Sequence, residues 1–120
     1  MALDTIVEQG RAIVEGTPDE RLLERPADVS LVIEACMSAD TELALLYAEN
    51  LGAEFFDLSS RVAGDVLQKL RQYRVRLAAV CPPGTVRFST RFGEMLAEER
   101  RLPHFGVFDT REDALAWLLR

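Results

Sequence analysis

Two short segments near the start of the chain, residues 3–7 and 11–14, are rich in apolar and β-branched side chains. Gln9-Gly10 stands between them, and glycine favours the left-handed backbone of a tight two-residue turn. The pattern therefore predicts a β-hairpin. Residues 17–20, Thr-Pro-Asp-Glu, are typical of a turn and end the hairpin.

The next two segments are a helical pattern and a short apolar run. After Pro26, Asp28 is placed to cap a helix. Its apolar positions recur at spacings of three and four and share one face: Val29, Val32, Ile33 and Cys36. Residues 43–48 are almost continuously apolar. The length of that run favours a strand buried on both faces, with a helix as the alternative.

Between residues 60 and 73 the pattern has the period of a helix. The apolar positions again share one face: Val62, Ala63, Val66, Leu67 and Leu70. Ser59 or Ser60 is a suitable N-cap for this helix. Gly64 lies inside it, where glycine costs about 1 kcal/mol relative to alanine. We therefore expect a neighbouring strand to approach the helix closely at Gly64.

Two further strand–helix units complete the pattern. Residues 75–80 favour a strand that ends at Pro82 and Pro83, since proline cannot donate to a ladder. Ser89 or Thr90 then begins a helix, and residues 104–108 form the last strand. The final helix opens with one of two capping-box spacings: Asp109 with Glu112, or Thr110 with Asp113.

These elements predict a single small α/β domain over residues 1–120. Their order is strand, strand, helix, strand, helix, strand, helix, strand, helix. Alternating strands and helices imply parallel pairing through right-handed crossovers, so the sheet is mostly parallel, with an antiparallel N-terminal hairpin strand. Residues 43–48, 75–80 and 104–108 should be mutually parallel. We expect four of their side chains in the core: Leu45, Leu77, Ala79 and Val107.

Composition and charge restrict the class of protein. The chain has 120 residues, 48% hydrophobic and 28% charged, with no repeat or linker, as expected for one globular domain. No apolar run approaches the roughly 20 residues of a membrane span. The first residues do not resemble a secretory signal, so we expect a cytoplasmic protein. Its net charge of −6 disfavours nucleic-acid binding.

The charge is divided unevenly along the chain. Residues 1–60 hold 13 acidic and three basic residues, whereas residues 61–120 hold seven acidic and 11 basic ones. The two halves either fold against each other or present a dipolar surface to a partner or a second copy. Three of the bases, Arg71, Arg74 and Arg76, are interpreted as a solvent-facing helix end.

Residues 55–78 include the motifs Phe55-Phe56-Asp57-Leu58, Ala63-Gly64-Asp65 and Tyr73-Arg74-Val75. With these motifs, residues 30–120 resemble a family of small bacterial proteins known only as domain of unknown function 4180, and the resemblance is most specific between residues 55 and 78. It continues through Phe92, Glu98, the strand from Phe105 to Phe108, Asp113-Ala114 and Trp117-Leu118. The resemblance implies a fold more than a function, because no activity is known for that family.

The order of elements, and the Phe56-Asp57 pair before a helix, are also similar to STAS domains, the class of sulfate-transporter and anti-sigma-antagonist modules. Those modules bind partner proteins, and many are switched by phosphorylation of a serine directly after that aspartate. Here the residue after Asp57 is Leu58, and Ser60 replaces the usual glycine. The resemblance therefore implies the scaffold without the phosphoserine switch. We expect Ser59 and Ser60 to cap the helix rather than to carry phosphate.

Ligands and partners of open α/β sheets usually meet the crevice beyond the carboxyl ends of the strands. Three predicted loops end there, after residues 48, 80 and 108. They contribute the candidate surface: Glu49, Asn50, Asp57, Ser59, Ser60, Cys81, Thr85, Arg87, Ser89 and Asp109. For Asp57, Ser59 and Ser60, helix capping is the simpler interpretation, and an anion site beside a helix N-terminus is the alternative.

The same topology argues against catalysis and against a metal site. Cys81 follows its strand, whereas His104, the one histidine, begins the last strand at the opposite edge. A base at that distance cannot activate a thiol, or a serine such as Ser59 or Ser89. Cys36, Cys81 and His104 also lack the spacing of metal ligands. The sequence has no glycine-rich nucleotide loop, and we expect no cofactor.

The sequence thus predicts a non-enzymatic regulatory or protein-interaction module with an unidentified protein partner. The alternative is a small-molecule-binding protein or an unrecognised enzyme that uses the carboxyl-end loops. A homodimer is also expected, because the edge strand of the hairpin carries only Asp4 as a charge between residues 3 and 7 and is therefore thinly protected. The alternative is a monomer whose edge strand is simply short.

Overall fold

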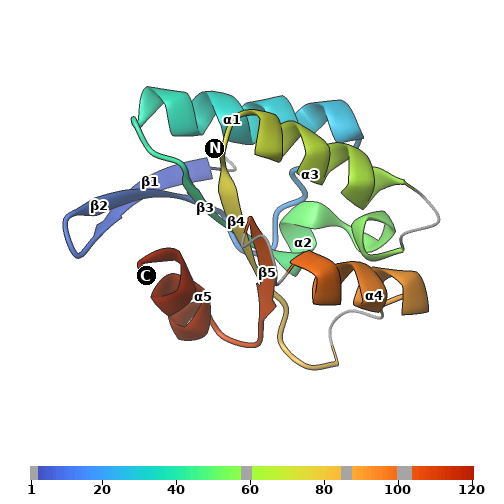
Figure 1. Ribbon diagram of the computed structural model, residues 1–120. Coiled ribbons are helices and arrows are strands. Elements are labelled where there is room, and N and C mark those ends of the chain that lie inside the picture. Colours follow the sequence, from blue (N-terminus) through green and yellow to red (C-terminus); the bar gives the residue numbers. More distant parts are fainter. Residues whose placement is uncertain (1–2, 58–60, 85–87, 100–103) are drawn as a thin grey trace.

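A computed structural model describes residues 3–57, 61–84, 88–99 and 104–120. Five strands form one sheet and lie side by side in chain order (Figure 1). They are β1 (Leu3–Glu8), β2 (Arg11–Gly16), β3 (Leu43–Tyr47), β4 (Arg76–Val80) and β5 (Phe105–Phe108). β1 pairs with β2 antiparallel, and every other pairing is parallel. The expected mixed sheet is confirmed.

The connections carry five α-helices in the described ranges: α1 (Val29–Ser38), α2 (Ala48–Leu51), α3 (Val62–Gln72), α4 (Thr90–Glu99) and α5 (Arg111–Leu118). Two short 3-10 helices, η1 (Pro26–Asp28) and η2 (Ala53–Phe56), precede α1 and follow α2. The predicted order did not include three of these elements, η1 before α1 and α2 and η2 between β3 and α3.

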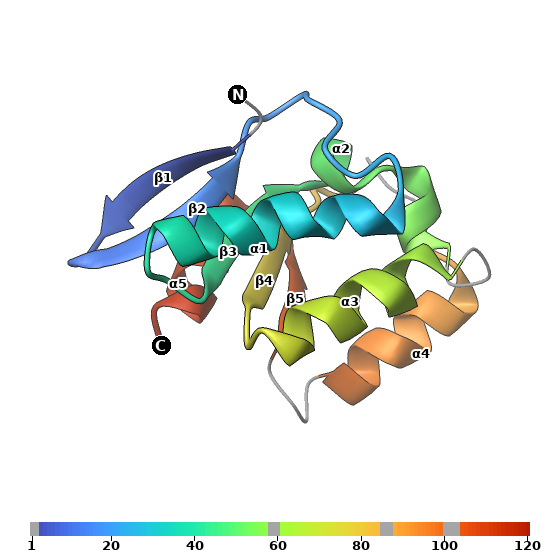
Figure 2. The same cartoon turned by 90° about the horizontal axis from the view of Figure 1, so that it is seen from above.

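The helices form a layer on each face of the sheet. Since the strands follow one another in order, right-handed crossovers place the connecting helices on the same side. α1, α3 and α4 accordingly lie together on one face, and α5 covers the opposite face (Figures 1 and 2). α5 contacts β3, β4 and β5. β1 and β2 extend beyond it (Figure 1).

Two hydrophobic clusters follow from this layering. The larger lies beneath α1, α3 and α4 and includes the predicted face of α1 and the predicted face of α3. Its centre is aromatic, with ring centroids 5.3 to 6.4 Å apart in the pairs formed by Phe55, Phe56, Phe92 and Phe105. The smaller cluster lies beneath α5 and contains Ile13, Leu45, Ala78 and Leu118.

Local signals in the sequence identified the turns and one helix start correctly. Gln9 and Gly10 have φ angles of 52° and 77°, the left-handed geometry of a two-residue hairpin turn. The backbone N–H of Glu20 donates to the carbonyl of Thr17 in the expected turn. Thr110 caps α5, because its hydroxyl accepts a hydrogen bond from the N–H of Asp113.

Three expectations about the elements need correction. β3 ends at Tyr47, and Ala48 begins α2, because the Asn50 side chain bonds back to the Tyr47 backbone and starts a helical turn there. Val107 is only partly buried. A Cβ built on Gly64 would meet nothing within 4 Å, so no close approach explains this exposed glycine.

Arg76 also differs from its interpretation as a solvent-facing charge. It begins β4, and its guanidinium donates to the carbonyls of Trp117 at 3.1 Å and Leu118 at 3.2 Å. It also lies 4.4 Å from the centre of the Trp117 ring. Burial lowers the pKa of Arg76, as do the charges of Arg11 and Arg120. Arg76 thus joins the start of β4 to the C-terminus of α5, where a cation is favourable.

Candidate interaction site at the carboxyl edge of the sheet

The carboxyl ends of β2 to β5 lie at one edge of the sheet, and Asn50 joins the loop after β3 to the turn after β2. Its Oδ1 accepts from the Tyr47 backbone N–H at 2.7 Å. Its Nδ2 donates to the carbonyls of Thr17 at 2.8 Å and Glu20 at 2.7 Å. The Asn50 side chain is fully buried. This candidate residue therefore serves the fold rather than a ligand.

The backbone around Asn50 strengthens the same junction. The Asn50 carbonyl accepts hydrogen bonds from the N–H groups of Leu22 and Leu23 at 3.0 and 2.8 Å. Gly16 lies against the amide, because a Cβ at that position would be only 2.3 Å from Asn50 Oδ1. The end of β2 must therefore be glycine for the Asn50 side chain to fit.

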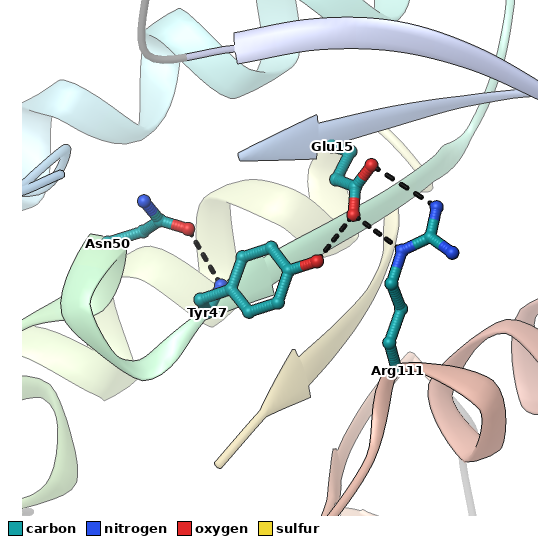
Figure 3. A network of polar contacts seen from close by, with 4 residues as sticks. All are labelled: Glu15, Tyr47, Asn50 and Arg111. Carbon is teal, nitrogen blue, oxygen red and sulfur yellow. Dashed lines mark hydrogen bonds and ion pairs between the residues drawn. The ribbon is translucent and has the colours of Figure 1, made fainter. Parts of the chain in front are cut away.

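A second polar network lies on the face of the sheet that α5 covers (Figure 3). The Tyr47 hydroxyl donates to Glu15 Oε2 at 2.5 Å. Arg111, at the start of α5, donates to the same oxygen from Nε at 2.8 Å and to Oε1 from Nη2 at 3.4 Å. Glu15 on β2, Tyr47 on β3 and Arg111 on α5 thus link three elements across the sheet.

The network changes the proton affinity of its members. Partial burial alone would raise the pKa of Glu15, but the hydrogen bonds from Arg111 and Tyr47 and the Arg111 charge hold it below its usual range. Burial and the neighbouring Glu15 carboxylate raise the pKa of Tyr47 to about 12. At neutral pH the network therefore contains a carboxylate, a neutral phenol and a guanidinium, which is a stable structural arrangement.

Cys81 is buried directly after β4. Burial raises the pKa of its thiol to about 12, and the negative charges of Glu49 and Asp109 act in the same direction. Because the thiolate is the reactive form, these surroundings oppose a nucleophilic role. Cys36, on the buried face of α1, is likewise inaccessible, and burial raises its pKa to about 11.

The remaining described candidates divide into a cap and a group of surface carboxylates. Ser89 accepts a hydrogen bond from the Phe92 N–H at 3.1 Å through its hydroxyl, and so caps the start of α4. Glu49, Asp57 and Asp109 are exposed. We refer to these three residues as the acidic rim. Glu49 and Asp109 both lie close enough to Cys81 for their charges to act on its thiol.

Four predicted site residues lie outside the described ranges: Ser59, Ser60, Thr85 and Arg87. In the structure the charges of Glu49 and Asp109 act on Cys81, so these three candidates lie near one another. Asn50 and Ser89 instead form hydrogen bonds within the fold. Sequence reasoning missed Glu15, Tyr47 and Arg111. Arg111 alone carried a signal, because a cation in the first turn of a helix opposes the helix dipole and calls for a nearby acid.

Two hollows in the described part of the molecule lie away from this edge. One, of about 740 Å³, opens at the amino end of the sheet beside Arg11, Thr41 and Tyr73. The other, of about 450 Å³, lies between β1 and α1. Within the described ranges, no three His, Cys, Asp or Glu side chains form a group able to hold a metal ion.

The molecule is a small α/β protein. The strands of its sheet follow one another in chain order, α1, α3 and α4 cover one face, and α5 covers the other. A family described as a domain of unknown function, DUF4180, matches residues 8–118, and the chain belongs to that family. No curated protein and no solved structure gives a significant match. No helix in the described ranges has the length and apolar composition that a membrane crossing requires.

Proposed function

We propose that this chain is a non-enzymatic protein-interaction or regulatory module of the cytoplasm, built on a STAS-like scaffold. The proposal is supported by the sequence of elements, in which an antiparallel edge strand leads a parallel sheet with alternating helices. It is also supported by the Phe56-Asp57 pair that precedes α3. Leu58 has no hydroxyl, so the proposal does not include the phosphoserine switch.

The observation that carries the proposal is the state of the polar groups at the carboxyl edge. Asn50 and Ser89 make hydrogen bonds within the fold, and the Cys81 thiol stays protonated at neutral pH. Of the described candidate residues at this edge, the exposed ones are the three carboxylates of the acidic rim. Such a surface is better suited to recognition than to covalent chemistry.

The charge of this edge indicates the chemistry of the partner. Besides the acidic rim, the neighbouring turn and the first turn of α5 add exposed acids: Asp19, Glu20, Glu112 and Asp113. We propose that the partner is a protein with a basic patch. Charge complementarity of this kind accelerates association and selects the partner more than it adds affinity.

The test compares three forms of the full chain as bait in extract from its own cells. Glu49→Arg reverses the charge of the acidic rim, and Glu42→Arg makes the same change at another exposed position, at the amino end of β3. We expect one protein to be enriched equally by the natural chain and by Glu42→Arg, and lost with Glu49→Arg. Equal recovery with all three baits would contradict the proposal.

The same captured material is analysed for co-purifying metabolites. A stoichiometric small molecule bound to the natural chain and lost with Glu49→Arg would instead support the alternative, a ligand-binding protein or enzyme that uses the carboxyl-end loops. A protein without such a metabolite supports the interaction module.

A further inference from the structure

The outer edge of β1 is a second candidate surface, on the other side of the molecule from β5. β1 pairs only with β2 within the described part of the sheet, through six consecutive residue pairs without a bulge. Proteins usually protect such an edge with proline, a bulge, charge or a covering segment. β1 contains no proline, and its charged residues are Asp4 and Glu8.

The hairpin turn determines which backbone groups point outward. In a two-residue hairpin the flanking residues, here Glu8 and Arg11, form a hydrogen-bonded pair, and such pairs alternate along the ladder. Asp4, Ile6 and Glu8 therefore direct their N–H and C=O groups toward β2. The N–H and C=O groups of Leu3, Thr5 and Val7 point away from the sheet, where another strand can add.

An apolar groove accompanies this edge. The hollow of about 450 Å³ between β1 and α1 has a mostly apolar lining surface, to which four apolar and four polar residues contribute: Leu3, Leu22, Leu31 and Ala35, and Asp4, Thr5, Glu34 and Ser38. Val7 is 69% exposed and Leu31 is 45% exposed. Side chains alternate along a strand, so Val7 lies on the same face as Leu3 and Thr5. Backbone and groove thus form one continuous surface.

We propose that this surface binds a second copy of the chain, with the two β1 strands antiparallel and centred on Thr5. In that register Leu3 of each copy lies opposite Val7 of the other, and the two Thr5 residues lie opposite each other. Apolar and β-branched cross-strand pairs of this kind stabilise antiparallel sheets. Val7 of the second copy lies next to Leu3 at the groove, and the two sheets join into one.

The charges on β1 select this register. Centring the pair on Ile6 places Asp4 opposite Glu8 of the second copy, and centring it on Asp4 places two aspartates opposite each other. Like charges directly opposite are destabilising. Centring on Val7 pairs only residues 6–8. With Thr5 at the centre, Asp4 lies opposite Ile6, and the whole of residues 3–7 is paired. This proposal is independent of the function proposed for the carboxyl edge.

The first experiment measures the mass of the full chain in solution by sedimentation equilibrium from micromolar to about 100 μM. We expect twice the 13.5 kDa of one chain. Val7→Lys should raise the dissociation constant at least tenfold. The control is Met37→Lys, because Met37 is 68% exposed, like Val7, but lies on α1 outside the groove. Circular dichroism checks that both variants are folded.

A monomeric natural chain at every concentration overturns the proposal, and so does equal weakening by Val7→Lys and Met37→Lys. A disulfide test then examines the register. Opposed residues have Cα atoms within the range that a disulfide spans, so Thr5→Cys should form a cross-linked dimer on mild oxidation and Ile6→Cys should not. The natural thiols, Cys36 and Cys81, are buried and do not interfere. Cross-linking through Ile6→Cys alone would contradict the proposed register.

Discussion

Asn50 is the one fully buried polar side chain in the described ranges, and it makes three hydrogen bonds. Two of them reach carbonyls in the turn after β2, and the third begins α2. A leucine has nearly the same volume but can make none of these bonds. Buried groups that lose their partners cost about 1–3 kcal/mol each.

We therefore predict that Asn50→Leu lowers the free energy of unfolding by about 3 kcal/mol, as measured by urea denaturation. Glu49→Gln, next to it and exposed, is the control and should change stability by no more than about 0.5 kcal/mol. A loss below about 1 kcal/mol in Asn50→Leu would mean that the loops do not depend on this side chain.

The Glu15 network makes stability depend on pH. The folded-state pKa of Glu15 lies below its usual range, so its carboxylate stabilises the fold above the ordinary carboxyl pKa. That contribution is lost as the pH falls through the lowered pKa. Arg111 is 40% exposed, so solvent screens the ion pair.

We predict that Glu15→Gln is less stable than the natural chain by about 1 kcal/mol at pH 7. The difference should close as the pH is lowered from about 5 through the lowered pKa of Glu15, since the natural chain then loses the same interaction. Urea midpoints measured across that range provide the test, with the exposed Glu34→Gln as a control that stays close to the natural chain. A difference that is constant with pH would show that the Glu15 charge is not involved.

At the scale of elements, α5 is fixed at both ends by arginines. Arg111 joins its start to β2, and Arg76 joins its end to β4. A guanidinium can donate to two carbonyls while it stacks on an indole, and an ammonium cannot do both. The packing of α5 should therefore be sensitive to the exchange of arginine for lysine at position 76.

We predict that Arg76→Lys destabilises the protein by about 1–2 kcal/mol. Trp117 is the one tryptophan of the chain, so its fluorescence reports directly on α5. Its emission should shift to longer wavelength in Arg76→Lys as the ring becomes more exposed. Arg74→Lys, at an exposed position two residues earlier, should leave both stability and fluorescence unchanged. Equal effects of the two changes would contradict the role of Arg76.

The sequence could predict those elements whose conformation depends on residues close by in the chain. The period of residues 62–70 and the Gln9-Gly10 turn each depend on neighbours in the chain. α2 was missed because Ala48 continues an apolar run, whereas the helical turn depends on Asn50, which bonds to Thr17, 33 residues away. Arg76 was misinterpreted for the same reason, since its partners lie 41 and 42 residues further on.

At the scale of the whole molecule, the parallel sheet could be predicted because strands and helices alternate, and that rule then located the carboxyl edge. The chemistry of the edge could not be predicted in the same way. Asn50 and Cys81 could be identified as candidate site residues because they lie in predicted loops at this edge. Both are buried in the structure, and this burial, which the sequence did not predict, makes them part of the fold. Glu15 and Arg111 are 96 residues apart, and no local pattern joins them.

We propose that the carboxyl edge is a recognition surface and not a site of covalent chemistry. Cys81 provides the direct test, because it is the described thiol at that edge and the charges of Glu49 and Asp109 act on it. With a pKa of about 12, only about one Cys81 thiol in 10,000 is ionised at pH 8.

The decisive measurement is mass spectrometry of the folded chain after treatment with iodoacetamide at pH 8, with the denatured chain as the control. We predict that Cys81 and Cys36 stay unmodified in the folded protein and that both react once it is unfolded. Rapid, stoichiometric alkylation of Cys81 in the folded chain, with an apparent pKa below 8, would contradict this proposal and indicate a reactive thiol at this edge.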